Sequence, residues 1–114
     1  MSECLFCQIV ADAVASTPVA QSETALAIRD INPQAPVHVL VIPRVHLTSA
    51  DQVTAGHGGI VDELVLLAQQ VAEQEGVRES GYRLVMNVGP DAQMTVGHLH
   101  LHLLGGRQMQ WPPG

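Results

Sequence analysis

The sequence predicts an α+β domain in which an antiparallel sheet carries helices on one side. Three observations lead to this prediction. The 114 residues suffice for one domain with a buried core, and 46% of them are hydrophobic. Short apolar runs rich in Val, Leu, Ile and Ala alternate with turn residues, and two segments have helical apolar spacing. We expect a single domain over residues 1–114, with 105–114 as a tail that has no regular pattern.

Two segments have the apolar spacing of amphipathic helices. The first is a short one at residues 4–13, and the second and stronger one covers residues 58–75. In the longer segment one stripe is apolar, and most of the acidic and amide side chains lie off it. Gly76 stands where a left-handed residue would end this helix. The apolar stripe consists of Ile60, Val61, Leu64, Leu67, Ala68 and Val71.

Four segments are expected to form strands. Residues 24–29 and 37–42 are apolar runs bounded by turn residues, and Pro43 ends the second of them. Residues 82–88 and 97–104 follow the long helix and have the same character. Their order along the chain favours antiparallel pairing with the helices outside the sheet.

Charge and hydropathy exclude several classes of protein. The formal net charge is −6, and the basic residues are five scattered arginines with no lysine, so we expect no binding to a nucleic-acid polymer. No apolar run approaches the roughly 20 residues that span a bilayer, so we expect no membrane insertion. Residues 1–10 lack the basic start and apolar run of a signal peptide, and we expect a cytoplasmic protein. In that compartment the Cys4-x-x-Cys7 pair indicates a metal site or a redox pair.

The most informative segment alternates histidine with leucine. Side chains alternate between the two faces of a strand, so His98, His100 and His102 share one face and the intervening leucines share the other. We expect the leucine face to enter the core and the histidine face to border a cleft. Imidazoles offer a nucleophilic nitrogen and positive donors near neutral pH, which is what attack on phosphorus requires. A metal-binding strand and a solvated sheet face are the alternatives.

This histidine run, with what flanks it, resembles the signature of the histidine triad family. Residues 98–104 read His-Leu-His-Leu-His-Leu-Leu, and the following 105–114 resemble the tail of its nucleotide-binding branch. Residues 30–38, followed by Val-Ile-Pro at 41–43, match the first half of that branch. The resemblance runs from Leu5 to Gly114.

The resemblance implies a fold and a reaction. The fold is a five-stranded antiparallel sheet with two helices, and the sheet continues across a homodimer. The reaction is hydrolysis of the P–N bond in purine nucleoside phosphoramidates, or cleavage of related aminoacyl adenylates. It proceeds through a covalent nucleotidyl-histidine that water hydrolyses to the nucleoside monophosphate.

The resemblance also assigns roles to individual residues. His100 corresponds to the nucleophile, and His102 and His38 to the histidines that contact the phosphate and the leaving group. Asp30 corresponds to the carboxylate that binds the ribose hydroxyls, and Trp111 is expected to reach the site of the partner subunit. The remaining nucleotide-binding positions are the base-pocket residues Leu5, Phe6, Ile28 and Ile31, and the phosphate-side residues Asn87 and Thr95.

Several of these residues also have ordinary structural explanations. Asp30 could stabilise a turn after a strand, and Asn87 before Gly89-Pro90 could do the same. Phe6 and Ile31 could be core residues, and His38 could be a hydrogen-bonded core histidine.

The chain departs from the family pattern just before the triad. Gln93 and Met94 stand where the family has Gly and Gln, and Gly97 occupies a position that is often aromatic. Ile28 replaces an aromatic residue of the base pocket, and Gln110 stands where some relatives have His. Because Met94 hydrogen-bonds only weakly, a purine nucleotide-binding or interaction module with little turnover is the alternative function. A nucleotidyl transferase is a third, but it requires an acceptor site for which the chain has little room.

A structural zinc is the expected cofactor, and no organic cofactor is expected. Two cysteines and two histidines are a common closed set of zinc ligands. The resemblance implies that the ligands are Cys4, Cys7, His46 and His98. Zinc would link the first helix to two strands, which helps a domain of this size.

Overall fold

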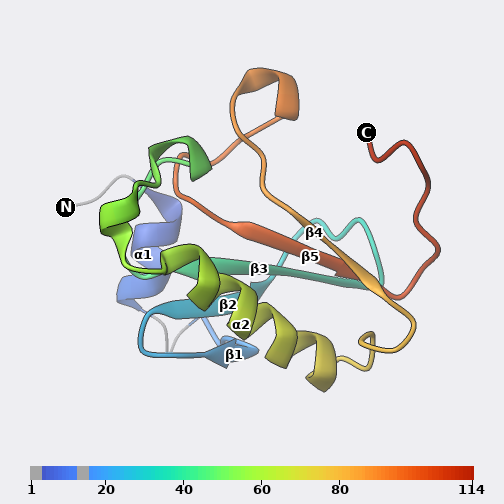
Figure 1. The fold of residues 1–114 in the computed structure, drawn as a ribbon. Helices are drawn as coiled ribbons and strands as arrows, with labels where there is room; N and C mark the ends of the chain where they lie inside the picture. The colour runs from blue at the N-terminus through green and yellow to red at the C-terminus, as the bar shows by residue number, and fades with distance from the viewer. Residues whose placement is uncertain (1–3, 13–15) are drawn as a thin grey trace.

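The computed structural model describes residues 4–12 and 16–114, and within these ranges the chain forms two α-helices and five strands (Figure 1). In chain order these elements are α1 (Leu5–Ala11), β1 (Ala20–Gln21), β2 (Ala25–Arg29), β3 (Val37–Pro43), α2 (Ile60–Gln74), β4 (Tyr82–Val85) and β5 (Leu101–Gly105). Short 3-10 turns at Ala50–Gln52, Ala55–His57 and Pro90–Ala92 interrupt the connections. The fold class is the α+β architecture that the sequence predicts. The sequence predicted β2 but not the two-residue strand β1.

All neighbouring strands pair antiparallel, in the order β1-β2-β3-β5-β4. The strand that carries His102 therefore lies beside the strand that carries His38, although 64 positions separate the two residues. In the register of β3 and β5, Leu40 faces His102 and His38 faces Leu104. This pairing makes His38 and His102 diagonal neighbours on one face of the sheet.

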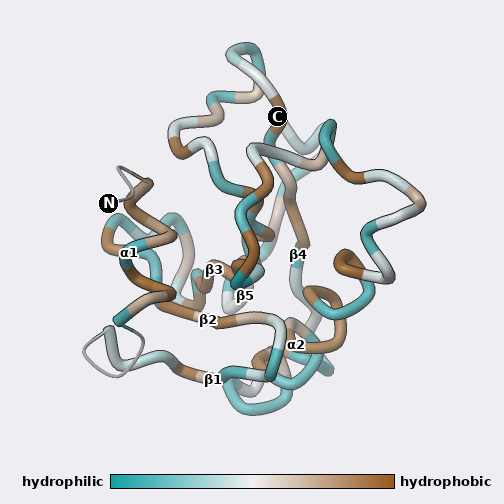
Figure 2. Tube along the Cα trace, turned by 90° about the vertical axis from the view of Figure 1, so that its left-hand side faces the viewer, coloured by the Kyte–Doolittle hydropathy of each residue, from teal (hydrophilic) through white to brown (hydrophobic). Residues whose placement is uncertain are grey.

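The helices cover opposite faces of the sheet, which corrects the expectation that both lie on one side. Figure 2 shows α1 and α2 on either side of the strands. One core cluster joins the buried stripe of α2 to Val39, Val41 and the leucines of β5. The other joins Phe6 of α1 to Leu26, Ile28, Leu40 and Ile42. Because β2 and β3 are buried on both faces, they have continuous apolar runs that do not reveal which helix covers which face.

The longer helix is bounded by glycines. Gly58 and Gly59 have φ of 57° and 79°, so the helix begins at Ile60, two residues later than expected. Gly76 has φ of 72°, which confirms the left-handed end predicted from the sequence.

Strand β5 is shorter than the expected 97–104, because it begins at Leu101. His98 and His100 therefore precede the regular strand. Pro43 explains the difference: it has no N–H for the ladder, and its carbonyl accepts a bond from His98 Nε2 at 3.0 Å. The Leu99 N–H instead donates to the carbonyl of Leu47 at 2.6 Å.

Other boundaries also differ from the sequence expectations. Strand β4 ends at Val85, short of Val88, and α1 covers Leu5–Ala11. The last residue of the expected first helix, Ala13, lies outside the described residues. In the described part of the chain, no helix has the length and apolar character to cross a bilayer.

Candidate active site and metal centre

A pocket of about 240 Å³ opens on the face of the sheet that α1 covers. Its walls are mostly aliphatic, and polar groups from Asp30, Thr95, His100 and His102 meet at it. The strand register builds its floor, because Ile28 pairs with Leu40 and Leu40 pairs with His102. Such a mixture of apolar walls and a few convergent polar groups is typical of a small-molecule site.

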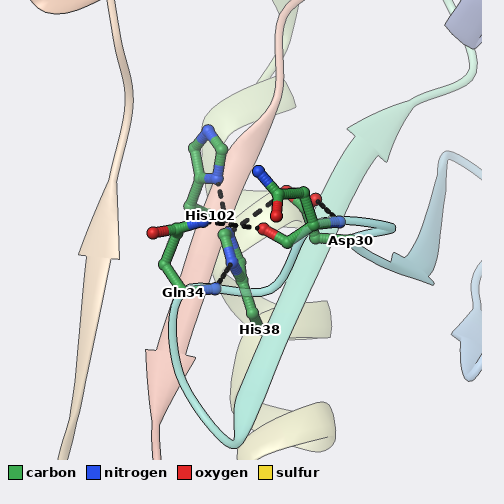
Figure 3. Close-up of polar contacts among 5 residues, drawn as sticks. Asp30, Gln34, His38 and His102 are labelled. Carbon is green, nitrogen blue, oxygen red and sulfur yellow. Dashed lines mark hydrogen bonds and ion pairs between the residues drawn. The ribbon is translucent and has the colours of Figure 1, made fainter.

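His38 and His102 are held together by a chain of hydrogen bonds (Figure 3). The Gln34 backbone N–H donates to His38 Nδ1 at 3.0 Å, so this nitrogen carries a lone pair and the proton is on Nε2. His38 Nε2 lies 2.9 Å from His102 Nδ1 and 3.4 Å from Asp30 Oδ2. His102 Nδ1 must then accept, which leaves the second nitrogen of a neutral His102 protonated.

His100 has the opposite tautomer. Its Nδ1 lies 2.7 Å from the backbone carbonyl of His98, and a carbonyl only accepts, so Nδ1 carries the proton. Nε2 of neutral His100 is therefore an unprotonated nitrogen, which is the form that a nucleophile needs. The ring is oriented by Phe6, whose edge-to-face contact has a centroid distance of 5.1 Å and an interplanar angle of 88°.

Burial keeps the paired histidines neutral. Desolvation, with smaller effects from His100 and His38, lowers the pKa of His102 to about 4, although Asp30 opposes the change. Desolvation also lowers the pKa of His38, again against the attraction of Asp30. The tautomers assigned to His38 and His102 are thus those of the protein at neutral pH.

Four side chains from distant parts of the chain form a metal-competent cluster. The ligand atoms of Cys4, Cys7, His46 and His98 all lie within 4.8 Å of one another. Their separations are 3.1 Å between the two Nδ1 atoms and 3.2–3.4 Å between sulfur and nitrogen. Tetrahedral zinc, with bonds of about 2.0 Å to nitrogen and about 2.3 Å to sulfur, requires similar spacing.

The hydrogen bond of His98 also suits a metal ligand. His98 Nε2 donates to the carbonyl of Pro43, which leaves Nδ1 with its lone pair toward the two sulfurs. Desolvation lowers the pKa of His98, so the ring is neutral, as metal binding requires. The residues present therefore fit zinc.

A second group of candidate ligands, Asp30, His38 and His102, does not fit a metal equally well. Binding a metal through His38 Nε2 would move the proton of a neutral ring to Nδ1. That proton would face the Gln34 N–H, and two donors would then point at each other. The Gln34 N–H thus favours hydrogen bonding over metal binding in this group, whereas the Pro43 carbonyl favours metal binding by His98 in the Cys/His cluster.

The pocket collects most of the predicted nucleotide-binding residues. Besides His100 and His102, its lining includes Leu5, Phe6, Ile28, Asp30, Ile31 and Thr95. Two of these residues also have the structural roles considered as alternatives. Phe6 is a core residue, and Asp30 Oδ1 accepts the Asn32 N–H at 2.8 Å in a turn. Ile31 is fully exposed and is not a core residue.

Three predicted residues do not line the pocket. His38 is absent from the lining and contacts His102, which belongs to it. Asn87 follows β4, and the described lining does not include it. Trp111 is 82% exposed in the tail, also outside that lining. Gln93, at the departure from the family pattern, keeps the left-handed backbone that glycine prefers, with φ of 59°.

The site also contains residues that were not predicted from the sequence. Leu40 and Ile9 line the pocket, and both could have been found, since Leu40 shares a strand face with His38 and Ile9 shares a helix face with Phe6. Gln34 acts through its backbone N–H, for which the sequence has no signal. A larger hollow of about 560 Å³ lies at the end of α2, but it is lined by the exposed residues Glu73, Gly76, Arg78 and Glu79, away from this chemistry.

Comparison with known proteins identifies the family. The family model described as "HIT domain" matches residues 12–109. The chain is 49% identical to the "14 kDa zinc-binding protein" of Zea mays, over 99% of this chain and 89% of that one. It is 40% identical to the "Purine nucleoside phosphoramidase" of Escherichia coli, over 94% of this chain and 90% of that one.

A solved structure supports the same identification. The HIT family hydrolase from Legionella pneumophila superposes with a TM-score of 0.92 at 45% identity, covering 98% of this chain and all of that one. The chain therefore belongs to the HIT, or histidine triad, family, as its sequence predicts.

The lowered pKa of His102 predicts how the free energy of unfolding changes with pH. Its value of about 4 in the folded protein lies below the value of about 6.5 expected in the unfolded chain. Between these values the unfolded state binds more protons, so the free energy of unfolding falls as the pH falls through this window. Urea denaturation between pH 7 and pH 4 should show a shallower fall for His102→Asn than for the wild type. Equal slopes for His102→Asn and the wild type would contradict the assignment.

Proposed function

We propose that this protein is a nucleotide hydrolase that cleaves the P–N bond of purine nucleoside phosphoramidates. The observation that carries the proposal is the tautomer of His100, whose Nδ1–H donates to the His98 carbonyl and leaves Nε2 as a lone pair at the pocket. The activity named for the Escherichia coli relative supports the choice of substrate.

The reaction proceeds in two displacements. His100 Nε2 attacks the α-phosphorus, the P–N bond breaks, and the leaving amine takes up a proton from solvent. Water then attacks the phosphorus and breaks the P–N bond to His100, gives up a proton to solvent, and so releases the nucleoside monophosphate and restores His100. His102 donates a hydrogen bond from its second nitrogen to the phosphate oxygens, and His38 holds His102 in the donating tautomer.

The remaining pocket residues bind the nucleoside. Asp30 accepts hydrogen bonds from the ribose hydroxyls, since a carboxylate offers several acceptor positions. Leu5, Phe6, Ile28 and Ile31 contact the base, and Thr95 lies on the phosphate side. Asn87 would need the loop after β4 to approach the pocket when substrate binds.

Zinc is proposed as a structural cofactor held by Cys4, Cys7, His46 and His98. When bound, it supplies a link between the start of α1 and the segments that follow β3 and precede β5. The name of the Zea mays relative supports a zinc-binding role. His98 would be occupied as a ligand, so His100 and His102 are left for the reaction.

We propose a homodimer in which the edge strand β4 pairs with its copy and the tail reaches the partner subunit. β4 pairs only with β5 among the described strands, which leaves one of its edges for a second copy. Arg83 of β4 donates to the carbonyl of Gln110 at 3.1 Å, so the tail passes beside β4. The exposed Trp111 would then extend from the edge toward the partner's pocket.

His100→Ala should abolish turnover of an adenosine phosphoramidate while nucleotide binding remains largely intact. The substitution removes the nucleophile, whereas Asp30 and the apolar walls still hold the nucleoside. During turnover by the wild type, denaturation without acid should trap AMP on the tryptic peptide 84–107, and fragmentation should locate it on His100. Tight binding without wild-type turnover would instead favour a binding module, and AMP on another histidine would contradict the mechanism.

Protein purified without chelator should contain about one equivalent of zinc per chain. Cys7→Ser should lower both the zinc content and the melting temperature, because it removes one of four ligands, while His57→Asn, outside the cluster, should leave the zinc content unchanged. Cobalt substitution should give the absorption of a tetrahedral site with thiolate ligands. Less than about a tenth of an equivalent of zinc, even after refolding with zinc, would refute the proposal.

Sedimentation at micromolar concentration should give the mass of a dimer. Deletion of residues 111–114 should leave that mass unchanged, because the tail tip is not part of the paired strands. The same deletion should alter the selectivity for the leaving group, since Trp111 is proposed to reach the partner's site. A monomeric mass for the wild type would contradict the dimer.

A further inference from the structure

The turn after β5 contacts the loop that precedes β3. Arg107 Nε–H donates to the backbone carbonyl of Gln34 at 3.0 Å. Next to it, Gly106 has φ of 87°, and a Cβ there would lie 3.0 Å from Pro36 Cβ. This close approach, at a backbone angle that side chains rarely adopt, presses the turn against the loop.

The loop in turn contacts His38 through one backbone group. The Gln34 N–H donates to His38 Nδ1, and the Gln34 side chain donates to the carbonyl of Asn32 at 3.0 Å. Asp30 accepts the N–H of Asn32, so the loop is braced at its start as well. In Figure 3 the labelled side chains of Asp30, His38 and His102 converge beside Gln34.

A backbone N–H can act only as a donor, so its position selects one tautomer of the ring that it contacts. Neutral His38 must carry its proton on Nε2, which then donates to His102 Nδ1. His102 is thereby left with a proton on its second nitrogen. If the Gln34 N–H moved away, His38 could exchange its tautomer, and His102 could lose its donor to the substrate.

We propose that Arg107 is a positioning residue for the triad, acting through the Gln34 backbone to fix the tautomers of His38 and His102. Its side chain is not part of the described pocket lining, so it acts at a distance from the substrate. The contribution to turnover rests on the proposed hydrolase function, whereas the effect on the tautomers does not.

The chain offers a matched control. Arg83 also donates to a backbone carbonyl, that of Gln110 in the tail. Within the described residues, Arg83 has no hydrogen bond to the loop before β3. Arg83→Ala and Arg107→Ala therefore remove the same side chain and the same kind of bond. Gln34→Ala is a second control, because it keeps the N–H that contacts His38, and Gln34→Pro removes that N–H.

The primary test is NMR of protein labelled with ¹⁵N-histidine, at about pH 7.5, where an ordinary histidine is mostly neutral. Two-bond ¹H–¹⁵N spectra distinguish protonated from unprotonated ring nitrogens. Wild type, Arg83→Ala and Gln34→Ala should show His38 protonated at Nε2. Arg107→Ala and Gln34→Pro should shift the His38 and His102 signals toward mixed tautomers, with His57 unchanged. An unchanged His38 signal in folded Arg107→Ala, or an equal shift in Arg83→Ala, would overturn the proposal.

Kinetics provide the second readout. Arg107→Ala should lower kcat for an adenosine phosphoramidate by about three- to tenfold, the value of one ordinary hydrogen bond, with KM little changed. Arg107→Lys should recover part of the loss, because an ammonium also donates to a carbonyl. A shift in tautomer with unchanged kcat would refute the role in turnover. If the wild type shows no turnover, the hydrolase proposal fails, and the NMR result still decides whether Arg107 fixes the tautomers.

Discussion

The pairing of β3 with β5 is the constraint on which the site depends. Both faces of β3 are buried, one beneath α2 and the other beneath α1. A slip of one residue would exchange the two faces, moving His38 into the α2 core and Val39 toward the pocket. The two hydrophobic clusters therefore fix the register, and the register places His38 diagonally from His102. The geometry of the two histidines is in this sense a consequence of core packing.

Backbone groups then assign a role to each ring. The Gln34 N–H faces His38, the His98 carbonyl faces His100, and the Pro43 carbonyl faces His98. A backbone donor or acceptor cannot reverse its role, as a hydroxyl can, so each contact selects one tautomer. Rings of the same residue type thus carry their proton on different nitrogens: on Nε2 in His38 and His98, and on Nδ1 in His100.

His98 connects the Cys/His cluster to the pocket. Its ring belongs to the Cys/His cluster, while its carbonyl orients His100. Phe6, between the two cysteines in sequence, contacts both rings, with centroids 5.9 Å from His98 and 5.1 Å from His100. Order in the cluster and the orientation of His100 are therefore coupled by direct contacts.

The sequence by itself determined the α+β class, the alternation of histidines with core leucines, the end of α2 at Gly76, and the candidate residues of the pocket and the Cys/His cluster. These follow from local periodicity and from motif spacing. Only the tertiary structure decided that α1 and α2 cover opposite faces, that β5 begins after His100, and that Gln34 and Arg107 belong to the network. The physical reason is that strand pairing and backbone hydrogen bonds join distant segments, and a backbone N–H or carbonyl is the same in nearly every residue.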